Sequence, residues 1–308
     1  MTQKTIPKDH LARIQSPTAR PNIIMFACLL YFLFIPDIIL DLIVRPIIRT
    51  FEIDISHTAF HVIYLFIALG IPILAYVLYL AFTKQRISPA FYIKSLDKRN
   101  LAYVVILTLA FSFIVNPFLL EIPAILGSPP LHIPERNLAQ IIISGIVAAS
   151  IFEEFMFRGF LIKEYQNQRI SIWKIALATG LFFGLIHHGV QGIVFTAING
   201  FLWAYMLYLT RSIWAVIISH MLANSGFFWH PALYIRNLET YQAVMPVYAV
   251  VMIIVAVVSI PVFIIFLRKF IAHNRRKKEA PPKETASFTW TYWALIAAML
   301  AAIILFRI

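Results

Sequence analysis

Nine apolar stretches, each about long enough to cross a lipid bilayer as a helix, run through most of this sequence. A bilayer-crossing helix needs about 20 mostly apolar residues. The stretches lie at residues 22–44, 58–82, 101–124, 138–160, 173–190, 192–210, 212–230, 243–267 and 288–306. Because a spanning helix satisfies its backbone hydrogen bonds internally, we expect an all-α fold, a polytopic transmembrane helical bundle of about eight or nine spans.

The composition excludes an ordinary soluble domain. The chain is 61% hydrophobic and 13% charged, whereas a soluble domain carries about 25% charged residues. The single cysteine, Cys28, excludes an intramolecular disulfide and a Cys-rich zinc cluster. No short apolar core with a small-residue cleavage site follows the polar start of the chain, so we expect the first membrane helix to remain attached.

The positions of the basic residues predict the orientation. With the N-terminus in the cytoplasm, 20 of the 26 Lys and Arg residues fall in inside segments and five in outside segments. Cytoplasmic loops of membrane proteins carry this kind of excess. The net charge of +12 is therefore a feature of topology, and we expect no nucleic-acid partner. The basic stretch at 268–287 also favours contact with anionic lipid head groups.

These patterns predict four parts of the chain. They are a cytoplasmic segment at 1–21, a transmembrane bundle at 22–267, a basic cytoplasmic linker at 268–287 and a C-terminal transmembrane helix at 288–308. Within the first span, Pro36 and two aspartates indicate a helix that breaks or is partly re-entrant. The candidate functional core occupies residues 138–230.

Three ionisable residues interrupt the fourth span. Such groups cost roughly 2.5–3.5 kcal/mol each at the centre of a membrane helix, so they mark candidate functional positions. Glu154 and Arg158 are four residues apart, with the acid first, which favours an ion pair on one helix face. Glu153 points about 100° away and has no partner on its own helix, so it is free to act as a general base. The alternative is an ion-pair cluster that only joins helices.

Histidines occur in two later spans. Phe183 and His187 share one face of the fifth span, and the adjacent His188 is the alternative site histidine. His220 and Asn224, four apart in the seventh span, can both donate hydrogen bonds to an oxyanion. The structural alternatives are an interfacial histidine and an interhelical hydrogen-bonded pair.

The order of these motifs resembles the CPBP family of intramembrane proteases. That family includes the CAAX prenyl endopeptidases of the Rce1 type and bacterial proteins linked to bacteriocin self-immunity. The family pattern is EExxxR, FxxxH and HxxxN, and the matching residues here are Glu153, Glu154 and Arg158, then Phe183 and His187, then His220 and Asn224. The resemblance covers roughly residues 138–230.

The resemblance implies a role for each matched residue. Glu153 would be the general base that activates water, and His187 would help to position that water. His220 and Asn224 would stabilise the oxyanion at the scissile carbonyl. The resemblance thus implies a hydrolase, an intramembrane endopeptidase that acts on a membrane-embedded or lipidated protein.

The resemblance also implies that Glu154 and Arg158 order the site. A divalent metal such as zinc, held by Glu153, His187 and His220, is one reading, since two histidines and a glutamate form a sensible zinc set. A glutamate-driven mechanism without metal is the competing reading, and we favour it.

The depths of His187, Glu153 and His220 in the membrane lead to one further prediction. His187 lies roughly 10 Å deeper than Glu153 and His220 if its helix begins at the membrane surface. We therefore expect this helix to begin outside the membrane, with Trp173 and Lys174 in the cytosol or interface. The site would then open toward the cytoplasm.

Two other classes of function remain open from the residues alone. Buried Glu and His groups also serve proton relays in transporters, although the sequence has no inverted repeat of broken helices. A membrane scaffold or immunity protein without catalysis is the second class. In each case we expect an integral membrane protein in contact with lipids, in the plasma membrane if the source is bacterial.

Overall fold

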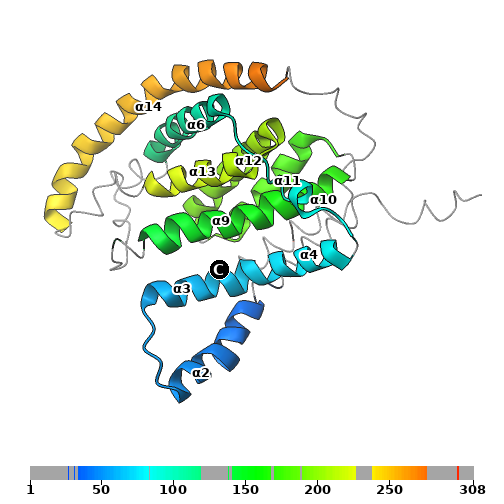
Figure 1. Ribbon diagram of the computed structural model, residues 1–308. Helices are drawn as coiled ribbons and strands as arrows, with labels where there is room; N and C mark the ends of the chain where they lie inside the picture. The colour runs from blue at the N-terminus through cyan, green and yellow to red at the C-terminus, as the bar shows by residue number, and fades with distance from the viewer. Residues whose placement is uncertain are drawn as a thin grey trace, which may run out of the picture.

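The protein is described by a computed structural model, in which residues 34–82, 84–118, 141–167, 170–187, 189–226 and 238–275 and the single residues 27, 31, 138 and 297 are placed. These residues form helices and no strand. The predicted all-α membrane bundle is therefore confirmed. Figure 1 shows the helices stacked side by side, with α14 curving over α6 at one edge and α2 standing off at the other.

The described part of the chain consists of a series of helices. In order, they are η1 (Leu40–Val44), α2 (Arg45–Thr50), α3 (His57–Leu65), η2 (Phe66–Gly70), α4 (Ile71–Phe82), α5 (Ile87–Ala90), α6 (Lys98–Asn116), η4 (Ile141–Ala148), α9 (Ala149–Glu154), η5 (Phe155–Leu161), α10 (Ile162–Asn167), α11 (Ile172–Leu185), α12 (Gly189–Thr210), α13 (Ile213–Asn224) and α14 (Leu238–Arg275). The segments labelled η are π-helical.

Four of the described helices are long and apolar enough to cross a membrane. They are Thr58–Phe82, Lys98–Asn116, Gly192–Thr210 and Glu239–Arg275. The helices α11 and α13 are apolar but contain only 14 and 12 residues. At 1.5 Å per residue they measure about 21 Å and 18 Å, which is short of a hydrocarbon core of about 30 Å.

The helix that carries the paired glutamates is long but not uniformly apolar. The segments η4, α9, η5 and α10 follow each other without a break from Ile141 to Asn167. Charged residues near the middle of this continuous helix lower its hydropathy. It packs against α13 on one side and against the α3–η2–α4 helix on the other.

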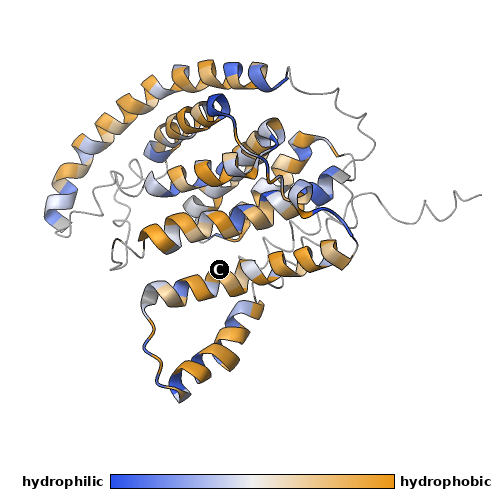
Figure 2. Cartoon of the chain, viewed as in Figure 1, coloured by the Kyte–Doolittle hydropathy of each residue, from blue (hydrophilic) through white to orange (hydrophobic). Residues whose placement is uncertain are grey.

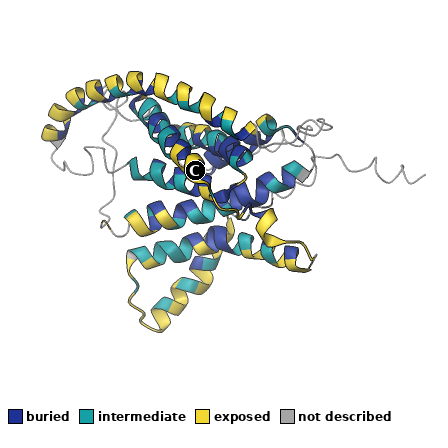
Figure 3. Ribbon diagram, turned by 45° about the horizontal axis from the view of Figure 1, so that its top comes forward, coloured by how far each residue is buried: buried dark blue, intermediate teal, exposed yellow. Residues whose placement is uncertain are grey.

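The outer surface of the bundle is apolar. Along α14, Val247, Ile254, Val257 and Val258 each expose 59% or more of their surface. Figure 2 shows this helix largely in the hydrophobic colour, and Figure 3 shows its outer side as exposed. A soluble protein rarely exposes so large an apolar face, whereas a lipid-facing helix requires one. The surface therefore fits an integral membrane protein.

Glycines allow α11 and α12 to pack closely. A Cβ atom on Gly180 would lie 2.8 Å from the backbone nitrogen of Phe201, and one on Gly184 would lie 2.6 Å from the carbonyl oxygen of Ile193. Small residues at such contacts let two helix backbones approach in a membrane. This close pair forms one wall of the site described below.

Buried asparagines join the ends of α6 and α14. Asn274 donates to the side-chain oxygen of Asn100 at 2.8 Å, and both residues are at most 3% exposed. Asp97 caps the N-terminus of α6 by accepting from the backbone nitrogen of Asn100 at 2.9 Å. These bonds fix the C-terminal end of the longest helix to the bundle.

The boundaries differ from the predicted spans mainly at helix ends. Helix α14 continues through Arg275, eight residues beyond the predicted end of its span and into the predicted linker. The third span was predicted to reach residue 124; its α-helix ends at Asn116, residues 117 and 118 continue it as π-helix, and residues 119–124 lie outside the described residues. The predicted segments at 1–21 and 288–308, apart from residue 297, lie outside the described residues, as does His188.

Candidate active site

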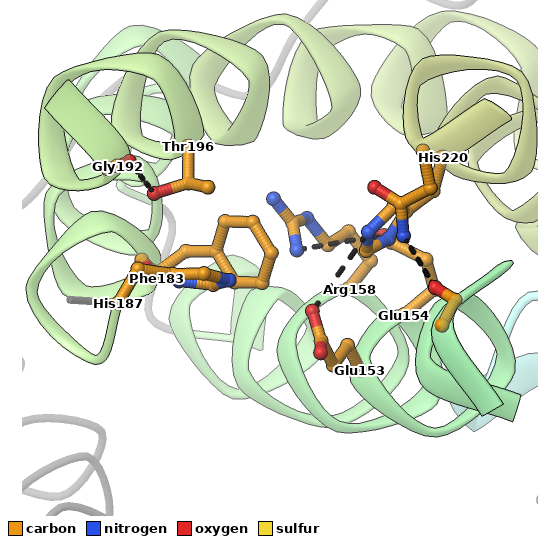
Figure 4. A network of polar contacts seen from close by, with 10 residues as sticks. Glu153, Glu154, Arg158, Phe183, His187, Gly192, Thr196 and His220 are labelled. Carbon is orange, nitrogen blue, oxygen red and sulfur yellow. Dashed lines mark hydrogen bonds and ion pairs between the residues drawn. The ribbon is translucent and has the colours of Figure 1, made fainter. Parts of the chain in front are cut away.

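A buried ion pair lies at the centre of the candidate site (Figure 4). The Nη1 atom of Arg158 donates to the Oε1 atom of Glu154 at 3.1 Å, and both side chains are fully buried. Their four-residue spacing places them on one helix face, so the predicted pair is confirmed. A buried charge is tolerated when it is paired in this way.

His220 joins this ion pair from α13. Its Nδ1 atom lies 2.8 Å from the same Oε1 atom of Glu154. Since an ionised carboxylate only accepts hydrogen bonds, the Nδ1–H of His220 is the donor. Glu154 thus receives hydrogen bonds from two helices, and Nδ1 of His220 is held against the buried ion pair.

Glu153 faces the opposite nitrogen of the same ring. Its Oε2 atom lies 3.8 Å from Nε2 of His220, beyond hydrogen-bond distance, and its side chain is 14% exposed. Among the described residues, this oxygen has no hydrogen-bond partner. The two adjacent glutamates therefore occupy different environments, because Glu154 is sealed and bonded whereas Glu153 is partly open and unbonded.

His187 completes the group just beyond the end of α11. Its Nδ1 atom lies 2.7 Å from the carbonyl oxygen of Phe183, and the two rings meet at 4.8 Å between centroids. Phe183 also meets the ring of His220 edge-on, with centroids 5.9 Å apart. One phenylalanine thus contacts both histidines, and the role of His187 in the site stays a prediction. The start of its helix relative to the membrane stays a prediction.

Asn224 lies one helical turn from His220 and binds elsewhere. Its Nδ2 atom donates to the carbonyl oxygen of Gly145 at 2.9 Å. This bond joins the end of α13 to the π-helical segment η4, which precedes the paired glutamates in the sequence. An amide nitrogen carries two hydrogens, so one N–H of Asn224 is left for another acceptor.

Residues 135–226 match the family described as type II CAAX prenyl endopeptidase, Rce1-like. The segment that carries the site is Rce1-like. The match covers under a third of the chain and includes all six predicted site residues. No curated protein and no solved structure matches the chain. The family supports an intramembrane protease activity in general.

The Rce1-like segment surrounds its charged residues with aromatic rings. The guanidinium carbon of Arg158 lies 4.3 Å from the ring centroid of Phe183 and 5.3 Å from that of Trp203. Trp203 also stacks on His220, with centroids 4.2 Å apart and an angle of 28° between the planes. Sequence reasoning missed Trp203, because a tryptophan within an apolar run gives no signal of contact with a charged site.

The side chains of the Rce1-like segment do not fit a metal site as they stand. Among the described residues, no group of three or more His, Cys, Asp or Glu side chains is arranged to hold a metal ion. The residues predicted to hold a metal, if one is needed, are Glu153, His187 and His220. Their side chains are thus not arranged as metal ligands. We therefore derive no chemical step through a metal.

Proposed function

We propose that this protein is an intramembrane endopeptidase in which Glu153 is the general base. The observation that carries the proposal is the contrast between the two adjacent glutamates. Glu154 is fully buried and accepts at Oε1 from both Arg158 and His220, whereas the Glu153 side chain is 14% exposed and its Oε2 atom, 3.8 Å from His220 Nε2, has no hydrogen-bond partner among the described residues. A general base needs an accessible lone pair within reach of the proton that it removes.

The attacking water would bind between Glu153 and His220. Two hydrogen-bonding atoms 3.8 Å apart can share one water molecule, since each bond needs about 2.8 Å. Glu153 takes a proton from this water, and the oxygen attacks the scissile carbonyl carbon. The protonated Glu153 then gives its proton to the leaving amine as the carbon–nitrogen bond breaks. In this proposal His187, whose ring packs on Phe183 beside His220, helps to position the water.

His220 and Asn224 would stabilise the oxyanion. With both ring nitrogens protonated, His220 donates from Nδ1 to Glu154 and keeps its Nε2–H for the developing negative charge. The second N–H of Asn224 is the other donor in this proposal. Fixed donors in a site that excludes water stabilise such a charge strongly, by about 3–4 kcal/mol for one donor in known cases.

The proposed substrate is a membrane-embedded or lipidated protein or peptide. A site built from helices of an apolar bundle is reached most directly by a chain that is already in the bilayer. We further propose that the N-terminus is cytoplasmic, because the basic residues concentrate in the segments that this orientation places inside. Membrane lipids, and no nucleic acid, are then the remaining partners.

The test compares new protein termini in membranes from cells that express the wild type or Glu153→Gln at equal levels. Glutamine keeps the shape of glutamate but cannot take the proton. We expect termini that appear only with the wild type, and a cleavage rate at least about 100-fold lower in the variant. Glu239→Gln, on the exposed first turn of α14, is the matched control and should cleave normally.

Two results would contradict the proposal. Identical termini for wild type and Glu153→Gln, with both proteins folded, would favour a scaffold or immunity function without catalysis. Cleavage by the purified wild type that stops with a metal chelator and returns with zinc would show that the glutamate-driven mechanism is wrong, although the protease assignment would stand.

A further inference from the structure

Trp203 stacks on the ring of the site histidine His220. It lies on α12, outside the three sequence motifs, and is 2% exposed. Its indole stacks on the imidazole of His220 at 4.2 Å, nearly parallel, and Phe183 meets the same imidazole edge-on at 5.9 Å. The imidazole therefore lies in a corner formed by two aromatic rings.

The hydrogen bond from His220 to Glu154 holds one edge of the ring, at Nδ1. The ring can still tilt through small joint rotations about its Cα–Cβ and Cβ–Cγ bonds, which would move Nε2 relative to Glu153. A parallel indole against the face of the imidazole removes this freedom, because rotation would force the two rings to overlap. The stacking thus determines the direction in which Nε2 points.

The indole nitrogen of Trp203 makes no hydrogen bond among the described residues, although it is buried. A buried donor without a partner costs about 1–3 kcal/mol. A tryptophan kept for its N–H would not be placed this way. Its contribution must therefore come from the ring face.

We propose that Trp203 is a positioning residue, which holds the imidazole of His220 in the plane that directs Nε2 toward Glu153. The same ring lies 5.3 Å from the guanidinium carbon of Arg158, so one side chain supports two members of the charged group. The catalytic consequence rests on the proposed protease function. The positioning itself can be measured without that function.

The experiment uses the full-length protein in membranes with three variants. Trp203→Phe removes the N–H but keeps a smaller aromatic face, whereas Trp203→Leu removes the aromatic face. Trp214→Leu is the control, because Trp214 lies on the same helix as His220 but is 42% exposed. Each protein is treated with diethyl pyrocarbonate, which modifies accessible imidazole nitrogens. Mass spectrometry then gives the modification rate of His220 relative to that of His273 in the same sample.

We expect Trp203→Leu to raise the relative modification rate of His220 several-fold, since the ring loses its cover and its fixed plane. Trp203→Phe and Trp214→Leu should match the wild type. With a cleavable substrate in hand, Trp203→Leu should lower kcat by roughly 10–100-fold with little change in KM, because small misplacements of a catalytic group have effects of that order.

Three outcomes decide the proposal. An unchanged relative rate for His220 in a folded Trp203→Leu protein would overturn it, and so would a Trp203→Phe protein as altered as Trp203→Leu. If Trp203→Leu unfolds, the more flexible Trp203→Met is measured in its place by the same criteria. Absence of proteolysis in the wild type would refute the proposed function, but the modification rates would still decide the role of Trp203.

Discussion

The buried ion pair gives the strongest test of how this site is held together. Arg158→Met keeps an unbranched apolar stem but removes the charge, so Glu154 is left fully buried with only His220 as a donor. Glu154→Gln leaves Arg158 without its acceptor in the same way. The double variant replaces both charges with neutral groups of similar size.

The expected loss of unfolding free energy follows from the burial of both Glu154 and Arg158. Breaking a buried pair by removing one member costs about 3–5 kcal/mol, and an unpaired charge in a membrane helix costs roughly 2.5–3.5 kcal/mol on insertion scales. Both routes give about 3 kcal/mol for each single variant. Since about 1.4 kcal/mol is a factor of ten, the ratio of folded to unfolded protein should fall by roughly 100-fold. The double variant should lose much less than the two singles together.

The assay is a double-mutant cycle measured by unfolding of the purified protein in mixed micelles. We expect a coupling energy of about 2 kcal/mol between Glu154 and Arg158, within the range for residues in one network. The chain supplies a matched control in Asp41 and Arg45, which have the same spacing and approach to 3.4 Å but expose 62% and 52% of their side chains. Such an exposed pair should couple by no more than about 0.5 kcal/mol. Equal coupling energies for the two pairs would refute the reasoning.

Two further variants test the packing around the site. Gly180→Ala should lower the unfolding free energy by about 1–3 kcal/mol, because the new methyl group would lie 2.8 Å from the backbone nitrogen of Phe201. The control Gly192→Ala has open space around the new methyl group and should leave the unfolding free energy unchanged. A Gly180→Ala protein as stable as the wild type would show that the two helices can separate freely. Asn274→Ala should cost about 1–3 kcal/mol in the same assay, since it leaves the buried amide of Asn100 without that partner, and an unchanged unfolding free energy would mean that the end of α14 is held by its apolar contacts alone.

The sequence predicted the parts of the site that depend on one helix. The pairing of Glu154 with Arg158 follows from a four-residue spacing, and the structure has that pair at 3.1 Å. The membrane helices were equally predictable, because long apolar runs give a strong signal. The helix ends were not, since a helix can continue past the apolar run into polar residues, as α14 does for eight residues beyond the predicted end of its span.

The contacts between helices could not be read from spacing. His220 and Asn224 share a helix face, which predicted a joint role, yet His220 contacts Glu154 and Asn224 contacts Gly145. Periodicity states which residues face the same way but not what lies opposite them. Nor did any sequence signal predict the π-helical turns on both sides of Glu153.

The different roles proposed for the two adjacent glutamates follow from charge balance as well as from geometry. Glu154 and Arg158 neutralise each other where no water reaches them, so the low-dielectric interior holds that pair without net charge. Glu153 and His220 are then neighbouring proton-exchanging groups, and the Glu153 side chain is the more exposed of the two, at 14% against 4%. A proton moved between Glu153 and a substrate therefore changes the charge at the accessible edge of the site. The bonds that orient His220 stay buried and intact through that step, which is the condition for a preorganised oxyanion donor.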